Sequence, residues 1–186
     1  MHIPVVVQYR HVHFSARDLE AVLGQTTPEV LQTLSHHGQV VYKQTVQIFG
    51  SDGFLDRVHV LGPAREHTQV EISPTDAATI GLHAPVRLSG DTDRAGTCRI
   101  KGPHGEIRAA MSVIVPARHL HLNEAVAKKL NLHHGQSVCL RVSTTSLQID
   151  HVTVRIHPSF VTEFHLTTDE AATYWLHTGD TVQLCA

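Results

Sequence analysis

Short apolar or alternating runs, separated by turns rich in glycine and proline, dominate the hydrophobic pattern of the chain. Runs of this kind predict β-strands. We expect strands over residues 4–9, 39–49, 54–61, 68–72, 97–101, 106–115, 136–143, 146–149, 151–157, 161–166 and 181–185, with a further one beginning at Val86. The segment 61–65 reads Leu-Gly-Pro-Ala-Arg and predicts a turn.

Helical periodicity is confined to short segments, each preceded by a residue that can cap a helix. The predicted helix starts are Ser15, Thr27-Pro28, Ser73-Pro74, Asn123 and Thr167. The second of these helices would carry Leu31 and Leu34 and end near Gly38. Short helices among many strands favour a mainly β fold, with β-barrels capped by helices, over a parallel α/β sheet.

Composition narrows the class of protein. The chain has 186 residues, 41% of them hydrophobic, and a net charge of -2, so it can build a core and has no basic footprint for nucleic acid. No apolar run is long enough to span a membrane. Cys98, Cys139 and Cys185 are odd in number and follow no C-x-x-C spacing. This predicts reduced thiols in a cytosolic setting.

Two parts of the sequence occur twice. Arg10-His11-Val12-His13 and Arg118-His119-Leu120-His121 each follow an apolar run and precede a helix start. With 17 His in the chain, chance alone gives about 1.5 His-x-His pairs. The evidence is therefore the context that the two pairs share, namely the preceding Arg and apolar run and the helix start that follows. Residues 71–79 also align with 165–173 without a gap. The pattern indicates an internal duplication and hence two barrels.

The repeated histidines suggest metal binding. On a strand, residues i and i+2 face the same side, about 7 Å apart at Cα, so two imidazoles can converge on one ion. The alignment adds Glu71 in the first half and His165 in the second. The expected ligand sets are His11, His13 and Glu71, and His119, His121 and His165. Three such ligands suit Zn²⁺ and leave a position open; the alternative is ordinary polar histidines on barrel rims.

Several cationic residues accompany these sets. Arg65 in its Gly-Pro segment can grip an oxyanion bidentately, or it is a solvated loop residue. Arg10 and Arg118 are expected to point away from the histidines and to form structural ion pairs. The pairs His36-His37 and His133-His134 precede glycines at predicted helix ends, where a positive charge complements the helix dipole.

Taken together, these stretches resemble the phosphate propanoyltransferases of the propanediol-utilisation type. The matching stretches are 10–13, 61–65, 68–73, 85–87, 89–91, 117–121 and 165 with 168–171. The resemblance implies two β-barrels, one built from residues 1–9 and 117–186 and the other from 10–116, with the first strands exchanged. It also implies two zinc ions between the barrels, held by the two ligand sets, and Arg65 as the essential catalytic residue.

The resemblance further implies reversible transfer of a propanoyl or acetyl group between coenzyme A and inorganic phosphate. Lys43, Leu61 and His165 would contact coenzyme A. The partners would be acyl-CoA and acyl phosphate, without nucleic acid or membrane, in a chain that can form a homo-oligomer. The expected location is the bacterial cytoplasm, or a microcompartment entered without the targeting extension that some relatives carry.

The sequence departs from the family at positions near the coenzyme A channel, namely Gln8, Tyr9, His59 and Ala172. Two alternatives therefore stay open. One is a metal-dependent enzyme of another class, such as a hydrolase or a cupin-like dioxygenase, although no Glu stands at the cupin spacing after either His pair. The other is a non-catalytic relative that keeps its metals.

Overall fold

The computed structural model describes residues 1–34 and 38–185, and the chain divides into two units. Unit 1 contains Met1–Gln8 and the chain from Ala117 onward, and unit 2 is Tyr9–Pro116. Each unit has a core of its own, made mainly of Val, Leu and Ile.

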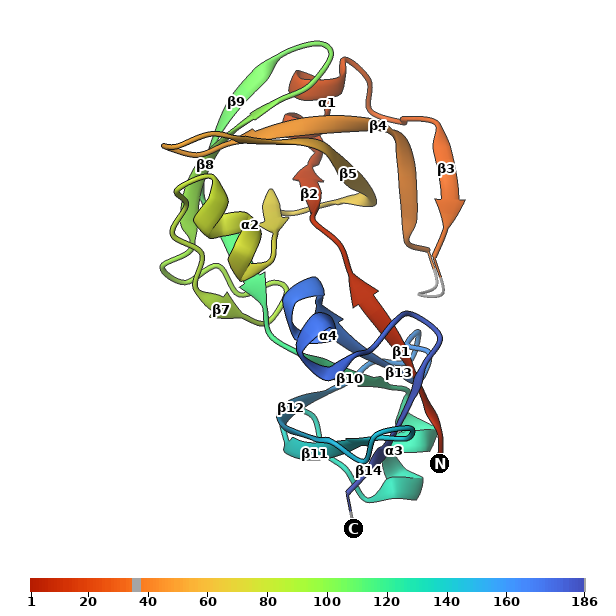
Figure 1. Cartoon of the computed structure of the whole chain (residues 1–186). Coiled ribbons are helices and arrows are strands. Elements are labelled where there is room, and N and C mark those ends of the chain that lie inside the picture. Colours follow the sequence, from red (N-terminus) through yellow and green to blue (C-terminus); the bar gives the residue numbers. More distant parts are fainter. Residues whose placement is uncertain (35–37, 186) are drawn as a thin grey trace. The chain divides into compact units, whose positions relative to one another are not determined.

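Unit 2 is a closed β-barrel with two short helices (Figure 1). Its elements are β2 (His11–Ser15), α1 (Ala16–Leu23), β3 (Val30–Thr33), β4 (Val40–Phe49), β5 (Phe54–Arg65), β6 (Gln69–Glu71), α2 (Pro74–Thr79), β7 (Val86–Arg87), β8 (Gly96–Lys101) and β9 (Glu106–Pro116). The ring runs β4-β5-β2-β6-β9-β8 and closes because β8 pairs with both β9 and β4. Strands β3 and β7 pair with β4 and β9 outside this ring.

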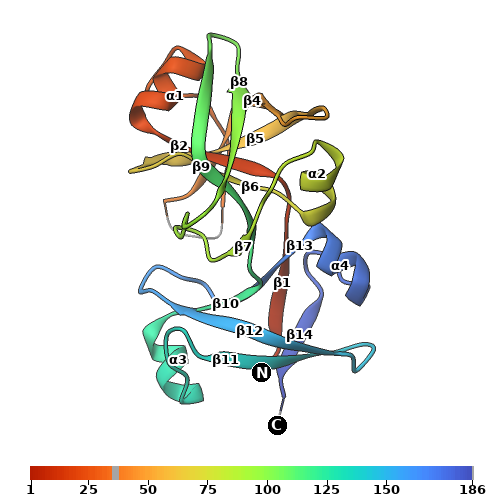
Figure 2. The same cartoon turned by 90° about the vertical axis from the view of Figure 1, so that its left-hand side faces the viewer.

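Unit 1 is a second closed barrel (Figure 2). Its elements are β1 (Ile3–Gln8), β10 (His119–Leu122), α3 (Glu124–Leu130), β11 (Ser137–Val142), β12 (Gln148–Ile156), β13 (Glu163–Thr167), α4 (Thr168–Tyr174) and β14 (Thr181–Leu184). The ring runs β1-β13-β10-β12-β11-β14. The prediction of a mainly β fold with two helix-capped barrels is therefore confirmed.

The two rings have the same pairing pattern. Each His-x-His strand lies between a parallel neighbour, β5 or β12, and an antiparallel one, β6 or β13. The strand that comes directly before each His-x-His strand in the sequence belongs to the ring of the other unit. Thus β1 pairs with β13 and β14, and β9 pairs with β6 and β8. The duplicated sequence thus gives two equivalent barrels with exchanged first strands.

Strand alternation separates the core from the polar positions. In β2, Val12 and Phe14 are fully buried in the apolar core, so His11 and His13 project to the opposite side. In β13, Phe164 and Leu166 are buried in the apolar core, and His165 between them projects to the opposite side. The i, i+2 reasoning from the sequence therefore describes these strands correctly.

The predicted helix opened by Thr27-Pro28 is wrong where the structure describes it. Residues 30–33 form β3, which pairs antiparallel with β4. All four residues of β3 are exposed, so this segment has no apolar stripe to bury as a helix, and pairing with β4 decides its conformation. The rest of that prediction, with His36 and His37, lies outside the described residues.

The predicted turn at 61–65 is also wrong, because β5 continues to Arg65. Pro63 lacks a backbone N–H, but it falls where the register between β2 and β5 shifts, between His13 and Ser15. A register shift leaves backbone groups outside the regular ladder, so a proline is tolerated there.

The two strands predicted at 146–149 and 151–157 are one strand, β12, in which His151 adopts a positive φ of 56°.

The prediction of reduced thiols is wrong for two of the three cysteines. Cys139 and Cys185 form a disulfide, with Cα atoms 5.4 Å apart. They are brought together because β11 and β14 are neighbours in the ring, which their separation of 46 residues does not reveal. Cys98 is a buried free thiol.

Among the described residues no helix is long and apolar enough to cross a membrane.

Candidate metal centre and anion site

The structure brings His11, His13 and Glu71 together in unit 2. Their candidate ligand atoms lie within 4.8 Å of one another, and all three residues are buried. His11 and Glu71 are register partners on β2 and β6, and His11 Nε2 lies 3.5 Å from Glu71 Oε2. Two imidazoles and a carboxylate in this arrangement can hold a divalent ion such as Zn²⁺.

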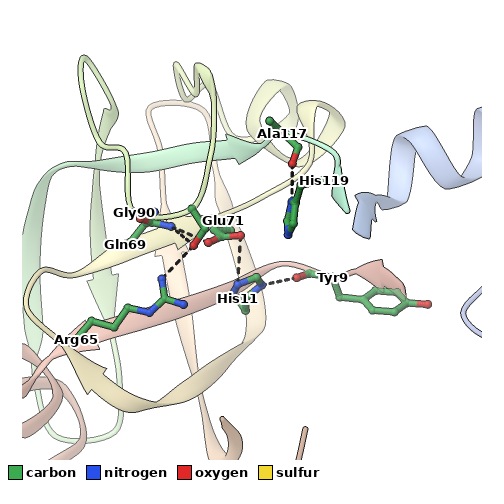
Figure 3. A network of polar contacts seen from close by, with 9 residues as sticks. Tyr9, His11, Arg65, Gln69, Glu71, Gly90, Ala117 and His119 are labelled. Carbon is green, nitrogen blue, oxygen red and sulfur yellow. Dashed lines mark hydrogen bonds and ion pairs between the residues drawn. The ribbon is translucent and has the colours of Figure 1, made fainter. Parts of the chain in front are cut away.

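A backbone carbonyl selects which nitrogen of His11 faces this group. His11 Nδ1 lies 2.8 Å from the carbonyl oxygen of Tyr9 (Figure 3). A carbonyl only accepts, so Nδ1 donates its proton there and neutral His11 presents the lone pair of Nε2 to Glu71. His119 Nδ1 makes the same contact, also 2.8 Å, with Ala117. Hydrogen bonding of the second ring nitrogen to a carbonyl is the usual arrangement for a metal-binding histidine.

The third member, His13, is held in its neutral form. Burial, and to a smaller extent electrostatic interaction with His11 and Arg65, lowers the pKa of His13 well below its ordinary value. Its Nδ1 is buried and makes no hydrogen bond to any residue that the structure describes. A neutral imidazole with a free lone pair is the form that binds a metal.

In unit 1 the rings of His119, His121 and His165 form a second cluster. Their centroids lie 4.6, 5.0 and 4.5 Å apart for the pairs His119–His121, His119–His165 and His121–His165. All three residues are at most 5% exposed. The ring of Phe160 stacks on His121 at 3.8 Å between centroids. Phe160 therefore contributes an apolar wall that the sequence did not predict.

Each strand that carries these residues runs directly into a capped helix. The last member on each strand stands two residues before a helix N-cap; the four N-caps are Ser15, Ser73, Asn123 and Thr167. Every cap side chain accepts a hydrogen bond from the third residue after it, so the four predicted helix starts are confirmed. Caps of this kind fix the strand ends that position the histidines and Glu71.

Two equivalent ion pairs tie these helices to the His-x-His strands. Arg10 Nη1 lies 3.0 Å from Asp76 Oδ1 in unit 2. Arg118 Nη1 lies 3.1 Å from Glu170 Oε1 in unit 1. The prediction that both arginines form structural pairs is therefore confirmed, and their acids occupy aligned positions of the duplication.

Arg65 ends β5 and joins a chain of polar contacts that leads to Glu71 (Figure 3). Its Nη1 donates to Ser89 Oγ at 3.1 Å, and Gln69 Nε2 donates to the same oxygen at 3.2 Å. Gln69 Nε2 also lies 2.6 Å from Glu71 Oε1, while Gln69 Oε1 accepts from the backbone N–H of Gly90 at 2.8 Å. Gln69 and Ser89 thus orient both the guanidinium and the carboxylate.

A cavity of about 260 Å³ adjoins this chain in unit 2. It is lined by His13, by Gly38 and Gln39, and by the end of β5 at Gly62, Pro63, Ala64 and Arg65. Its volume is below the roughly 300–1,000 Å³ of sites for drug-sized ligands, so it suits a small group. With Arg65 at its wall it is a natural place for an oxyanion.

Comparison with known proteins identifies the family of this chain. The family model for phosphate propanoyltransferase matches residues 4–177. The chain belongs to the phosphate propanoyltransferase family. It is 40% identical over 171 residues to the phosphate propanoyltransferase of Citrobacter rodentium, covering 91% of this chain and 81% of the relative. With the enzyme of Thermotoga maritima it shares 39% over 187 residues, covering 98% and 88%.

Phosphate propanoyltransferases are acyltransferases, and the family match spans all six predicted metal ligands. In this family member, Lys43 lies on β4 and pairs with Glu29. Leu61 lies on β5 opposite His13 on β2, and His165 belongs to the buried cluster of unit 1. Their expected contacts with coenzyme A stay predictions. The sequence did not predict Gln69, Ser89 and Phe160 as site residues. A single amide, hydroxyl or phenyl side chain carries no sequence signal of such a role, which depends on its neighbours in the fold.

Proposed function

We propose that this chain transfers a short acyl group, propanoyl or acetyl, reversibly between coenzyme A and inorganic phosphate, with one zinc ion at each ligand set. The family supports the reaction class. The observation that carries the site is the convergence of His11, His13 and Glu71 beside a cavity walled by Arg65. No other described group in this cavity carries a fixed positive charge.

Arg65 would bind the phosphate. Its planar guanidinium can donate two parallel N–H bonds to two phosphate oxygens. The hydrogen bond from Arg65 Nη1 to Ser89 already restrains the side chain. Arg65 therefore loses less conformational entropy when phosphate binds. Because His13 and Arg65 line the same cavity, phosphate on Arg65 would lie near the proposed metal ligands.

The chemistry needs no covalent enzyme intermediate. An oxygen of hydrogen phosphate attacks the thioester carbonyl carbon, a C–O bond forms, and the C–S bond breaks. The sulfur leaves as the thiolate of coenzyme A, which takes up the proton that phosphate gives up. Bound divalent ions supply Lewis acidity for the sulfur and the carbonyl oxygen. Arg65 offsets the negative charge that develops on the attacking phosphate.

Coenzyme A would be bound through Lys43, Leu61 and His165. An ammonium such as that of Lys43 can pair with a phosphate of the nucleotide part; this requires its pair with Glu29 to open. The positions Gln8, Tyr9, His59 and Ala172 differ from the family pattern, so the affinity for coenzyme A and the preferred acyl group are the properties most open to change.

The test is phosphate-dependent release of coenzyme A from propanoyl-CoA and acetyl-CoA, followed with a thiol reagent, beside elemental analysis of the same sample. We expect about two zinc ions per chain and release that saturates with phosphate. Release that does not depend on phosphate would indicate a thioester hydrolase. Two bound metals without release from either substrate would indicate a non-catalytic relative.

A further inference from the structure

A second cavity of unit 2, of about 470 Å³, is larger than the one at Arg65. Its walls come from the start of α1, from the segment between β5 and β6, and from β9, beside which α1 packs (Figure 2). The two cavities have no lining residue in common. The larger volume falls within the roughly 300–1,000 Å³ of sites for small organic ligands. This cavity can therefore hold more than an inorganic ion.

Two arginines that line this cavity have no acidic partner. Arg17 lies in the first turn of α1, and Arg108 lies on β9. Neither forms a hydrogen bond or an ion pair with any residue that the structure describes. Arginines elsewhere in the chain, in contrast, lie within 4.0 Å of a carboxylate oxygen, namely Arg10, Arg57, Arg87, Arg94, Arg99 and Arg118. Two guanidiniums at one cavity with their donors free favour the binding of an anion.

The two carboxylates at this cavity have other partners. Thr68 Oγ1 donates to Asp18 Oδ2 at 2.6 Å and accepts from the backbone N–H of Ser15 at 3.0 Å. Glu66 Oε1 lies 3.8 Å from His67 Nε2. Asp18 therefore braces the start of α1, and neither carboxylate pairs with the two arginines.

Met111 forms an apolar wall of the same cavity in a strained conformation. Its φ of 46° lies in the left-handed region, which a bulky side chain rarely adopts. The register of β8 and β9 leaves Thr97 opposite residues 110–112, so Met111 lies in a bulge. The backbone N–H of Met111 donates to Thr97 Oγ1 at 3.1 Å, and its side chain is 64% exposed. Strained residues persist where their surroundings hold them, and they concentrate at ligand-binding sites.

We propose that this cavity binds an organic phosphate monoester, with the phosphate on Arg17 and Arg108 and an apolar part of the ligand on Met111. A phosphate monoester carries close to two negative charges at neutral pH, which matches two guanidiniums. Each guanidinium can donate two parallel N–H bonds to phosphate oxygens. The volume leaves room for the organic part. The site is separate from the proposed acyl transfer and does not depend on it.

The chain offers a probe at the site, because Met1 and Met111 are its only methionines. Protein labelled with methyl-¹³C methionine gives two methyl signals, and Met111→Leu assigns them. The ligand used is phenyl phosphate, whose ring would lie on Met111 and shift its methyl resonance. We expect the Met111 signal to move in a saturable way, with a dissociation constant of about 1 mM or lower, and the Met1 signal to stay in place.

Arg17→Gln with Arg108→Gln removes both arginine charges of the cavity. Because hydrogen bonds between charged groups are the strong ones, we expect this double variant to raise the dissociation constant about tenfold or more. Arg57→Gln with Arg141→Gln is the matched control, since it removes the same charge from exposed arginines that do not line the cavity. It should bind phenyl phosphate as wild type does.

Arg65→Lys should also bind like wild type, because Arg65 belongs to the other cavity. Loss of binding in Arg65→Lys would place the ligand there and would overturn the proposal. A Met111 signal that does not move up to about 10 mM phenyl phosphate would overturn it as well, as would equal binding by wild type and by the variant of Arg17 and Arg108.

Benzoate and phenol, which carry one negative charge and none, test the class of ligand. We expect each to bind about tenfold or more weakly than phenyl phosphate. Benzoate that binds as tightly as phenyl phosphate would overturn the assignment to phosphate monoesters.

Discussion

Arg65 is the residue whose replacement should separate phosphate binding from metal binding. An ammonium cannot match two phosphate oxygens as a guanidinium does. We expect Arg65→Lys to keep both metals and to lose about a hundredfold or more in turnover, comparable to the loss of one transition-state donor. The loss should appear in the phosphate dependence more than in the coenzyme A dependence, measured by steady-state kinetics.

Arg57→Lys is the matched control for this experiment. Arg57 lies on the same strand as Arg65, with a side chain 87% exposed, and its replacement should leave the kinetics unchanged. Wild-type phosphate kinetics in Arg65→Lys would remove Arg65 from the mechanism, and loss of metal would assign it a structural role.

Cys98 gives a prediction on pH dependence. Burial raises the pKa of its thiol to about 12, from 9.0 for a free thiol, although a hydrogen bond with Ser112 works in the opposite direction. The unfolded chain therefore loses this proton before the folded one does. The contribution to the free energy of unfolding is complete below about pH 9 and falls as the pH rises toward 12.

The measurement is denaturant unfolding at pH 8 and pH 10.5, in wild type and in Cys98→Ala. We expect the wild type to lose more stability between the two pH values than the variant, which has no thiol to ionise. Equal losses in both would mean that Cys98 ionises as easily in the folded protein as in the unfolded chain.

Single residues also show what a sequence alone can establish about the site. The two His-x-His pairs and their third partners were predictable, because strand alternation and the internal repeat are both visible in the letters. Gln69 and Ser89 were not, because their role depends on donating to or accepting from Arg65 and Glu71, which lie on other elements.

At the scale of elements, the last part of β5 determines where Arg65 lies. Gly62 packs against the ring of Tyr42, and an added Cβ would lie 2.2 Å from the Tyr42 hydroxyl oxygen. Tyr42 is 8% exposed and has little room to move. We expect Gly62→Ala to displace residues 62–65, to cost about 1–3 kcal/mol as overpacking does, and to lower turnover more than zinc content.

Gly53→Ala tests the specificity of that effect. Gly53 lies in the turn between β4 and β5, and an added Cβ there would meet its nearest neighbour only at 4.0 Å. It should unfold and turn over like wild type. If Gly62→Ala behaved like Gly53→Ala, the path of β5 through Gly62 would not matter for the position of Arg65.

The elements were predictable where local signals agree with their surroundings. Four helices have a capping residue followed by an apolar face, and their starts follow from the sequence. Strand β3 and the end of β5 were not predictable. In both, pairing with another strand outweighs a local signal. Pairing of β3 with β4 outweighs Thr27-Pro28, and pairing of β5 with β2 and β4 outweighs Gly62-Pro63.

At the scale of the whole molecule, the disulfide links the ring of unit 1 at β11 and β14. In the chain-entropy model, a bond that closes a loop of this length contributes about 2–4 kcal/mol to the free energy of unfolding. We expect Cys139→Ser with Cys185→Ser to lower the unfolding free energy by that amount, and reduction of the wild type to do the same.

Reduction of the double variant is the control and should change nothing. A thiol count on denatured, unreduced wild type should give one thiol per chain, from Cys98. Three thiols in protein kept from reductants would contradict the disulfide.

The exchange of first strands also has a consequence for synthesis. Strand β1 leaves the ribosome before any other, but its partners β13 and β14 are among the last segments to be made. The whole of unit 2 is translated in between. The barrel of unit 2 can therefore close on the growing chain while Val5 and Val7 of β1 are still exposed to solvent. A chain released before β14 is made has one closed barrel and an exposed apolar strand, and exposed apolar strands of this kind are prone to pair with other chains.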